Sequence, residues 1–377
     1  EILNDRVENA VKSHCIANFK IAAGQSDEAF HGPVFIDTDL YKWIEAVSYL
    51  LSAEKNMELE NLCDQAIDLI ACAQQADGYL DTYYTVKEPG KRWTNLMEGH
   101  ELYCAGHLIE AGVAYFQATG KDQLLNVSRR FADLIAETFG EGKRRGYPGH
   151  PEIELALVRL YEVTRAEKYL ALAKYFIDER GTGEYLFENE CRREGHRFVF
   201  PEMMYFKADY FQAQQPVRQQ TQASGHAVRA MYLYSAMADL ARLTHDDELA
   251  AACERLFDDT TTRQMYVTGG VGAAKRGERF TTDFDLPSDS GYSETCASIG
   301  LMFFAQRMWL LNGKKGCYDI WEQALNNAVL SGMGRDGTHF FYVNPLEVVP
   351  QTVQHNPTLA HIKTQRQKWF GVACCPP

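Results

Sequence analysis

Apolar residues recur along most of the chain at steps of three and four, the spacing of one buried helix face. The helical stretches come in pairs separated by short polar breaks such as Thr119-Gly120-Lys121-Asp122. We expect the Thr, Ser or Asn of each break to cap the second helix by accepting a backbone N–H. This pattern predicts five helical hairpins, which start near residues 38, 99, 150, 222 and 291, and a further helix over residues 5–22.

The two helices of each pair differ in charge. The first helix carries few charges, as in residues 225–234, whereas the second has one charged face, as in residues 124–137. This asymmetry suits an inner ring of buried helices and an outer ring of half-exposed ones. The repeat therefore predicts an all-α (α/α)6 toroid, formed by residues 1–377 as one domain, with roughly eleven of its twelve helices recognisable.

Long loops rich in aromatic and polar residues interrupt the repeat at residues 77–84, 181–200 and 268–290. Loops of this length in a compact domain usually cover an active site. The alternation in residues 339–343 predicts some β structure near residues 338–350. The chain stops inside Cys374-Cys375-Pro376-Pro377, so we expect the natural protein to continue, for example into a β-rich domain.

Composition narrows the function classes. The chain has 377 residues and a net charge of −13, without a basic run, which argues against nucleic acid as a partner. No apolar run is long enough to predict a membrane span. Ten cysteines lack the regular spacing of a disulfide framework, which favours a reducing compartment and predicts a cytoplasmic protein. The choice between monomer and homodimer stays open.

The polar residues that could take part in catalysis or metal binding share one position in the repeat, the N-terminal end of the inner helix. They are Asp37, Asp39, Gly99-His100-Glu101, Gly149-His150, Gly225-His226, Glu294 and Cys296. Because inner helices of a toroid run nearly parallel, we expect these ends to meet at one mouth. A glycine before each histidine would let a ligand approach the backbone. Each histidine taken singly is also explained as a capping or packed residue.

Glu294, Cys296, Cys374 and Cys375 supply one carboxylate and three thiols, a donor set that suits a four-coordinate Zn²⁺ site. Glu278 is not needed as a ligand and is our candidate for proton transfer. The alternatives are buried structural thiols for the cysteine pair and a solvent-exposed loop residue for Glu278.

At these residues the chain resembles glycoside hydrolase family 127, the retaining β-L-arabinofuranosidases. The resemblance covers essentially the whole chain, and the order of the motifs makes it specific. The motifs are Gly99-His100-Glu101-Leu102-Tyr103, Gly146-Tyr147-Pro148-Gly149-His150-Pro151-Glu152, Gly225-His226-Ala227-Val228-Arg229, Gly277-Glu278-Arg279-Phe280, Glu294-Thr295-Cys296-Ala297 and Cys374-Cys375-Pro376-Pro377.

The resemblance implies an (α/α)6 barrel followed by β-sandwich domains that this chain lacks. It implies Cys374 as the nucleophile, which forms a thioglycosyl intermediate, and Glu278 as the general acid/base. Glu294, Cys296, Cys374 and Cys375 match its zinc ligands. His100, His150, His226 and Tyr342 match positions expected to contact the sugar of a glycoside or small oligosaccharide. A thiolate nucleophile departs from the usual pair of carboxylates in retaining glycosidases.

Two other function classes remain open. An unsaturated-uronide hydrolase or lyase-type enzyme could use the same toroid without a cysteine–zinc cluster. A non-catalytic sugar-binding toroid could use zinc only for folding, and would bind a ligand without turnover. Metal analysis and a screen of aryl glycosides, with and without a chelator, separate the three.

Overall fold

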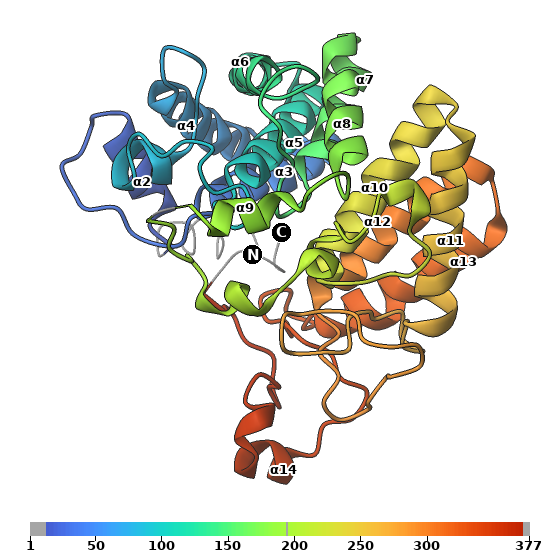
Figure 1. The fold of residues 1–377 in the computed structure, drawn as a ribbon. Helices are drawn as coiled ribbons and strands as arrows, with labels where there is room; N and C mark the ends of the chain where they lie inside the picture. The colour runs from blue at the N-terminus through green and yellow to red at the C-terminus, as the bar shows by residue number, and fades with distance from the viewer. Residues whose placement is uncertain (1–12, 194, 372–377) are drawn as a thin grey trace.

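The structure is a computed structural model that describes residues 13–193 and 195–371. Two concentric layers of helices build it, and the predicted all-α toroid of helical hairpins is confirmed (Figure 1). The five expected hairpins are α3/α4, α5/α6, α7/α8, α10/α11 and α12/α13. Their helices span Asp37–Ala53 and Met57–Ala73, Glu101–Thr119 and Gln123–Thr138, Ile153–Thr164 and Glu167–Glu179, Ala227–Thr244 and Asp247–Arg263, and Thr295–Asn312 and Lys315–Ala324.

The inner ring consists of α3, α5, α7, α10 and α12, each packed on the next. Of these, α5 and α10 are buried on nearly all sides, whereas the outer helices α6 and α11 bury one face against the inner ring. A further outer helix, α2, spans Cys15–Ala22 and packs on α3 and α4. The rest of the helix predicted over residues 5–22 lies largely outside the described residues. Among the described helices none is long and apolar enough to cross a lipid bilayer.

The helix caps at the hairpin turns differ from those that we predicted. The hydroxyls of Thr119, Thr164 and Thr244 donate to the carbonyl four residues earlier, in the last turn of the first helix. The caps of α4 and α11 are instead Asn56 and Asp246, whose side chains accept from the first free N–H groups of those helices. Our assignment of the caps to the Thr, Ser or Asn of the break was therefore wrong for these two helices, and also for α6, α8 and α13, which have no side-chain cap.

Short helical segments and loops complete the chain. They are the π-helix η1 (Tyr83–Lys87), α9 (Leu186–Cys191), the 3-10 helices η2 (Pro201–Tyr205), η3 (Ala208–Phe211) and η4 (Val217–Gln219), then η5 (Leu325–Val329), η6 (Leu330–Gly332), α14 (Pro350–His355) and η7 (Pro357–Leu359). The β structure expected near residues 338–350 is limited to isolated bridges, in which Phe340 pairs with Met333 and Gln367, and Val343 with Glu294.

The long loops gather at one end of the toroid and the hairpin turns at the other (Figure 1). Residues 181–211 and 268–294 belong to the loop end, where the inner helices begin. The aromatic residues of the 77–84 loop are core residues, since Tyr79 and Tyr84 are buried together with Trp93. Sequence alone left them between core and sugar-binding roles.

Candidate active site

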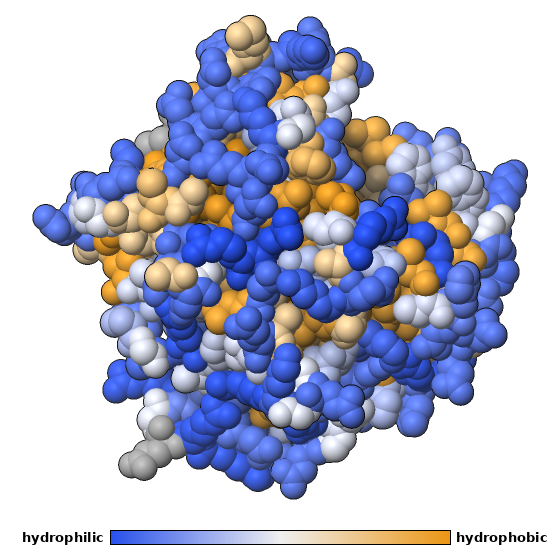
Figure 2. All heavy atoms as spheres, turned by 90° about the horizontal axis from the view of Figure 1, so that it is seen from above, coloured by the Kyte–Doolittle hydropathy of each residue, from blue (hydrophilic) through white to orange (hydrophobic). Residues whose placement is uncertain are grey.

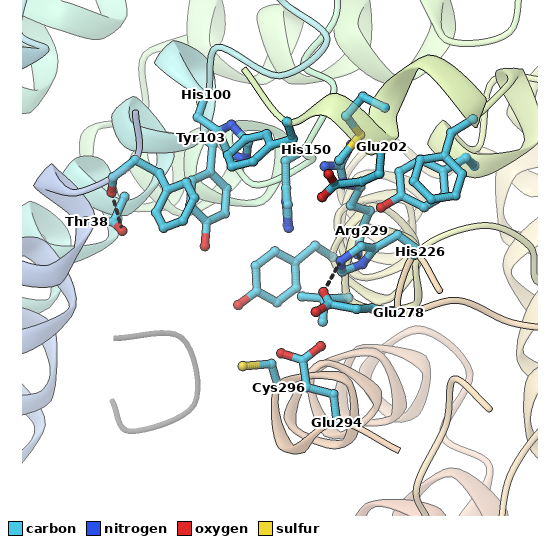
Figure 3. Close-up of a pocket in the computed structure, with 18 of the residues that line it drawn as sticks. Thr38, His100, Tyr103, His150, Glu202, His226, Arg229, Glu278, Glu294 and Cys296 are labelled. Carbon is cyan, nitrogen blue, oxygen red and sulfur yellow. Dashed lines mark hydrogen bonds and ion pairs between the residues drawn. The ribbon is translucent and has the colours of Figure 1, made fainter. Parts of the chain in front are cut away.

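A pocket of about 340 Å³ opens at the loop end, where the inner helices start. Every inner helix contributes to it at or near its first turn, as the repeat predicted. The described site candidates that line it are Asp39, His100, His150, His226, Glu278, Glu294, Cys296 and Tyr342 (Figure 3). Cys374 and Cys375 lie outside the described residues.

Two acidic candidates lie elsewhere. The Asp37 carboxylate is buried and accepts from the backbone N–H and hydroxyl of Thr82, which fixes the 77–84 loop. The Glu101 carboxylate accepts from the Tyr79 hydroxyl at 2.6 Å and the Trp93 backbone N–H at 2.7 Å. Both carboxylates are therefore structural in this fold.

The glycines before the histidines serve packing rather than ligand approach. A Cβ on Gly149 would lie 1.8 Å from the Met97 carbonyl oxygen. A Cβ on Gly225, whose φ is +70°, would lie 2.3 Å from the Tyr210 carbonyl oxygen. Neighbouring backbone occupies the space, so our expectation of a ligand at these glycines was wrong.

His100 and His150 are held through their Nδ1 atoms. Nδ1 of His100 donates to the Glu98 carbonyl at 2.6 Å, and Nδ1 of His150 to the Pro151 carbonyl at 2.9 Å. Burial, with the nearby Arg229 guanidinium, lowers the pKa of His100 to about 3 and that of His150 well below its usual value. Both rings are therefore neutral at pH 7, and each keeps Nε2 as a hydrogen-bond acceptor.

His226 has the opposite tautomer. Its Nδ1 accepts from the Arg229 backbone N–H at the start of α10, so the ring proton lies on Nε2. Nε2 donates to Glu278 Oε2 at 3.0 Å (Figure 3). The backbone joins the same two segments, because the Ala227 N–H donates to the Glu278 carbonyl at 2.9 Å.

Both carboxylate oxygens of Glu278 accept hydrogen bonds. Tyr292 donates its hydroxyl to Oε1 at 2.7 Å while His226 holds Oε2. The residue has a φ of +50°, a left-handed conformation in which its side chain faces the pocket. Its side chain remains one-third exposed, open to a ligand. Sequence reasoning gave Tyr292 no role, and only its position two residues before Glu294 hinted at one.

The loop after α9 forms the outer wall of the pocket. Buried Glu98 accepts from the backbone N–H groups of Val199 at 2.7 Å and Phe200 at 2.9 Å. This contact sets Phe200 against His100, with ring centroids 6.0 Å apart. Glu202 on η2 follows and faces the same pocket (Figure 3). Sequence reasoning placed a loop over the site but found none of these residues.

Glu294 and Cys296 are buried side by side at the start of α12, below Glu278 (Figure 3). A carboxylate and a thiol are two donors that Zn²⁺ accepts, so the residues present fit a zinc site. In the described part of the chain no group of three potential metal-binding side chains comes together. The other two predicted ligands are the cysteines outside it.

The lining also contains Lys42, Tyr103 and Arg229, which the sequence did not single out. The Lys42 ammonium donates to the Tyr103 hydroxyl at 3.1 Å, and the Tyr103 ring lies 4.4 Å from that of His150. Arg229 is buried and donates to the Gly149 carbonyl at 3.0 Å. Together they place further polar groups beside the histidines of a pocket that is also lined by aromatic side chains.

Three comparisons bear on this arrangement. A family model described as the β-L-arabinofuranosidase GH127 catalytic domain matches residues 1–377. A non-reducing end β-L-arabinofuranosidase of Bifidobacterium longum subsp. longum is 43% identical over 393 residues, covering 100% of this chain and 60% of that protein. A crystal structure of a GH127 β-L-arabinofuranosidase from Geobacillus stearothermophilus has a TM-score of 0.94 at 54% identity, over 100% of this chain and 59% of its own.

A cellobiose 2-epimerase from Spirochaeta thermophila has a TM-score of 0.53 at 12% identity, over 88% of this chain and 86% of its own. That likeness concerns the toroid alone. The chain spans 60% of the length of the curated relative that it matches.

Proposed function

The chain belongs to glycoside hydrolase family 127, whose β-L-arabinofuranosidase catalytic domain matches its whole length, and on that basis we propose that it removes terminal β-L-arabinofuranosyl groups with retention of configuration. The observation that carries the proposal is Glu278, held on both oxygens at the edge of a pocket lined by three histidines. A pocket of about 340 Å³ suits one sugar residue rather than a polymer, which supports exo action.

The histidines would bind the sugar hydroxyls. Nε2 of His100 and of His150 accept, because both rings are neutral and protonated on Nδ1. The Tyr342 side chain and the aromatic wall at Phe200 would cover the apolar face of the ring. Glycosides with β-L-arabinofuranose at the non-reducing end are therefore the substrate class that we propose.

Glu278 would act as general acid and then as general base. In the first step it protonates the leaving oxygen, and in the second it removes a proton from water. The two donors on its oxygens favour the carboxylate. In the acid form the protonated oxygen keeps a lone pair, so His226 and Tyr292 can go on donating to the carboxyl group while its O–H points to the leaving oxygen.

Cys374 is the proposed nucleophile and would hold the sugar as a thioglycoside until water releases it. We propose that Zn²⁺ is held by Glu294, Cys296, Cys374 and Cys375, a set to which the buried pair at the start of α12 contributes two donors. Bound zinc would supply deprotonated thiols at neutral pH. A cytoplasmic location agrees with the absence of disulfides among the eight cysteines of the described residues.

The test is turnover of an aryl β-L-arabinofuranoside, with the first-formed anomer of the released sugar followed by NMR. We expect the β anomer first, zinc near one equivalent per chain, and no turnover by Cys374→Ser. Glu278→Gln should lose activity mainly on substrates with poor leaving groups. Turnover of unsaturated uronides by metal-free protein would favour the uronide hydrolase instead. Binding without any turnover would favour the non-catalytic toroid.

A further inference from the structure

A second chamber follows the first along the axis of the toroid. It has a volume of about 500 Å³ and lies on the side of the hairpin turns. The helix faces that line the active-site pocket also line this chamber, through residues that follow at steps of three or four along each helix. Its polar lining consists of Lys42, Glu45 and Tyr49 on α3, His107 and Glu110 on α5, Glu152 and Arg159 at α7, Tyr232 on α10, and Cys296, Gln306 and Arg307 on α12.

Lys42, Tyr232 and Cys296 line both spaces and so form the partition between them. The chamber reaches solvent beside Tyr49, which is 53% exposed, and beside the exposed Gln306. Figure 2 shows one face of the molecule, on which mostly hydrophilic side chains surround smaller hydrophobic areas. A small molecule can therefore enter without passing the candidate active site.

The guanidinium groups of the outer half are all paired with carboxylates. The Arg159 guanidinium pairs with the carboxylates of Glu110 and Glu45 and also donates to the Tyr49 hydroxyl at 3.1 Å. Arg307 forms an ion pair with Asp239, and its Nε lies 2.6 Å from Asp239 Oδ2. Among the described residues that line this half, each guanidinium therefore already has a carboxylate, so an anionic ligand would find no unpaired guanidinium there.

The floor of the chamber contains a buried histidine whose hydrogen bonding is incomplete. His107 is 5% exposed, and within the described residues neither of its ring nitrogens has a hydrogen-bond partner. Glu152 Oε1 lies 3.4 Å from Nδ1. Burial lowers the pKa of His107 well below its usual value and raises that of Glu152 well above it. A neutral imidazole and a carboxyl group both need partners that donate and accept.

We propose that this chamber binds one small neutral polyol, of the size of a pentose, against His107 and Glu152. Hydroxyl groups both donate and accept, which is what these two side chains need, and the paired guanidinium groups argue against an anionic ligand. The rings of Tyr49, Phe303 and Tyr232 supply apolar faces for the C–H groups of a sugar. The volume lies within the usual range for ligand pockets. This inference does not depend on the proposed hydrolase activity.

The test is equilibrium dialysis of the purified protein against radiolabelled L-arabinose, with the anionic L-arabinonate as comparison. Ala46→Phe places a ring into the chamber from α3 without removing a polar group. His107→Phe removes the unsatisfied nitrogens and provides a second variant should the first fail to fold. Ala251→Phe, at an exposed position on α11, is the matched control.

We expect both chamber variants to bind one L-arabinose fewer per chain than the wild type, the control to bind as many, and L-arabinonate to bind at least tenfold more weakly. Equal stoichiometry in wild type and chamber variants would overturn the proposal, because any bound sugar would then occupy the other pocket. Absence of binding would assign the chamber to ordered water alone.

Discussion

The Tyr292 hydroxyl donates a 2.7 Å hydrogen bond to Glu278 Oε1, on the side of the carboxylate away from His226. Its ring stacks on that of His361, with centroids 5.7 Å apart, and packs with Val343, Leu359 and Ile362 in a small separate core. The segment after residue 340 therefore supports Glu278, the proposed proton-transfer residue, although it lies outside the helical repeat. Through this hydrogen bond Tyr292 holds the carboxyl group of Glu278 in position in both of its protonation states.

Tyr292→Phe should slow catalysis without unfolding the protein. It removes one hydrogen bond to a charged group, which is worth about 1.5–3 kcal/mol. We expect kcat to fall at least about tenfold for aryl β-L-arabinofuranosides with poor leaving groups, and less for activated ones, because proton transfer matters most when the leaving group is poor. Tyr318→Phe, at an exposed position on α13, is the control. An equal loss on all substrates would assign Tyr292 a purely structural role.

Glu98→Gln should weaken substrate binding more than chemistry. The two oxygens of Glu98 hold the backbone at Val199 and Phe200, and an amide can accept on only one atom. The wall of the pocket would then loosen while Glu278 keeps its partners. We expect KM to rise about fivefold, from the loss of about 1 kcal/mol, with a smaller change in kcat. Glu188→Gln, exposed on α9, should change neither. A drop in kcat alone would contradict this account.

Gly149→Ala should destabilise the fold. The added Cβ would lie 1.8 Å from the Met97 carbonyl oxygen, and backbone cannot move aside as a flexible side chain can. We expect a loss of about 3 kcal/mol or more in the free energy of unfolding, measured by urea denaturation. Gly316→Ala, in α13 with nothing within 4 Å of its added Cβ, should be neutral or slightly stabilising. Similar effects at both positions would remove the packing explanation for the Gly-His repeat.

The helical repeat was readable from the sequence because its physical basis is local. Burial on one face imposes a three- and four-residue spacing, and the repeat phase placed His100, His150 and His226 at one end of the toroid. The family motifs pointed to the same residues. Periodicity does not determine which of these side chains faces the pocket and which forms hydrogen bonds with a neighbouring loop. Asp37 and Glu101 share the phase of the site residues, yet both are used to anchor loops.

Contacts between segments far apart in the chain escaped prediction for the same reason. Tyr292 reaches Glu278 across a turn of the 268–294 loop, and Glu98 reaches Phe200 across about a hundred residues. Their partners depend on loop conformation, which side-chain patterns do not determine. The axial chamber was visible only as unexplained polar residues such as His107 and Glu152 on helices that otherwise read as buried.

Glu101 should make stability depend on pH. Burial raises the pKa of its carboxyl from 4.5 to about 8. Between these values the folded chain keeps a proton that the unfolded chain releases, so stability falls as pH rises. The contribution is fully present below pH 4.5 and is lost as the pH rises through 8, with a slope of at most about 1.4 kcal/mol per pH unit. Glu101→Gln, which cannot ionise, should flatten this dependence.

The measurement is the free energy of urea unfolding from pH 5 to pH 8 for wild type and variant. Other buried carboxyls contribute to the wild-type trend, since burial also raises the pKa of Glu190 to about 7. The informative quantity is therefore the difference between Glu101→Gln and wild type, which should shift in favour of the variant as the pH rises. Glu137→Gln, exposed on α6, should give a constant difference. A constant difference for Glu101→Gln as well would mean that its carboxyl is already ionised at pH 5 in the folded protein.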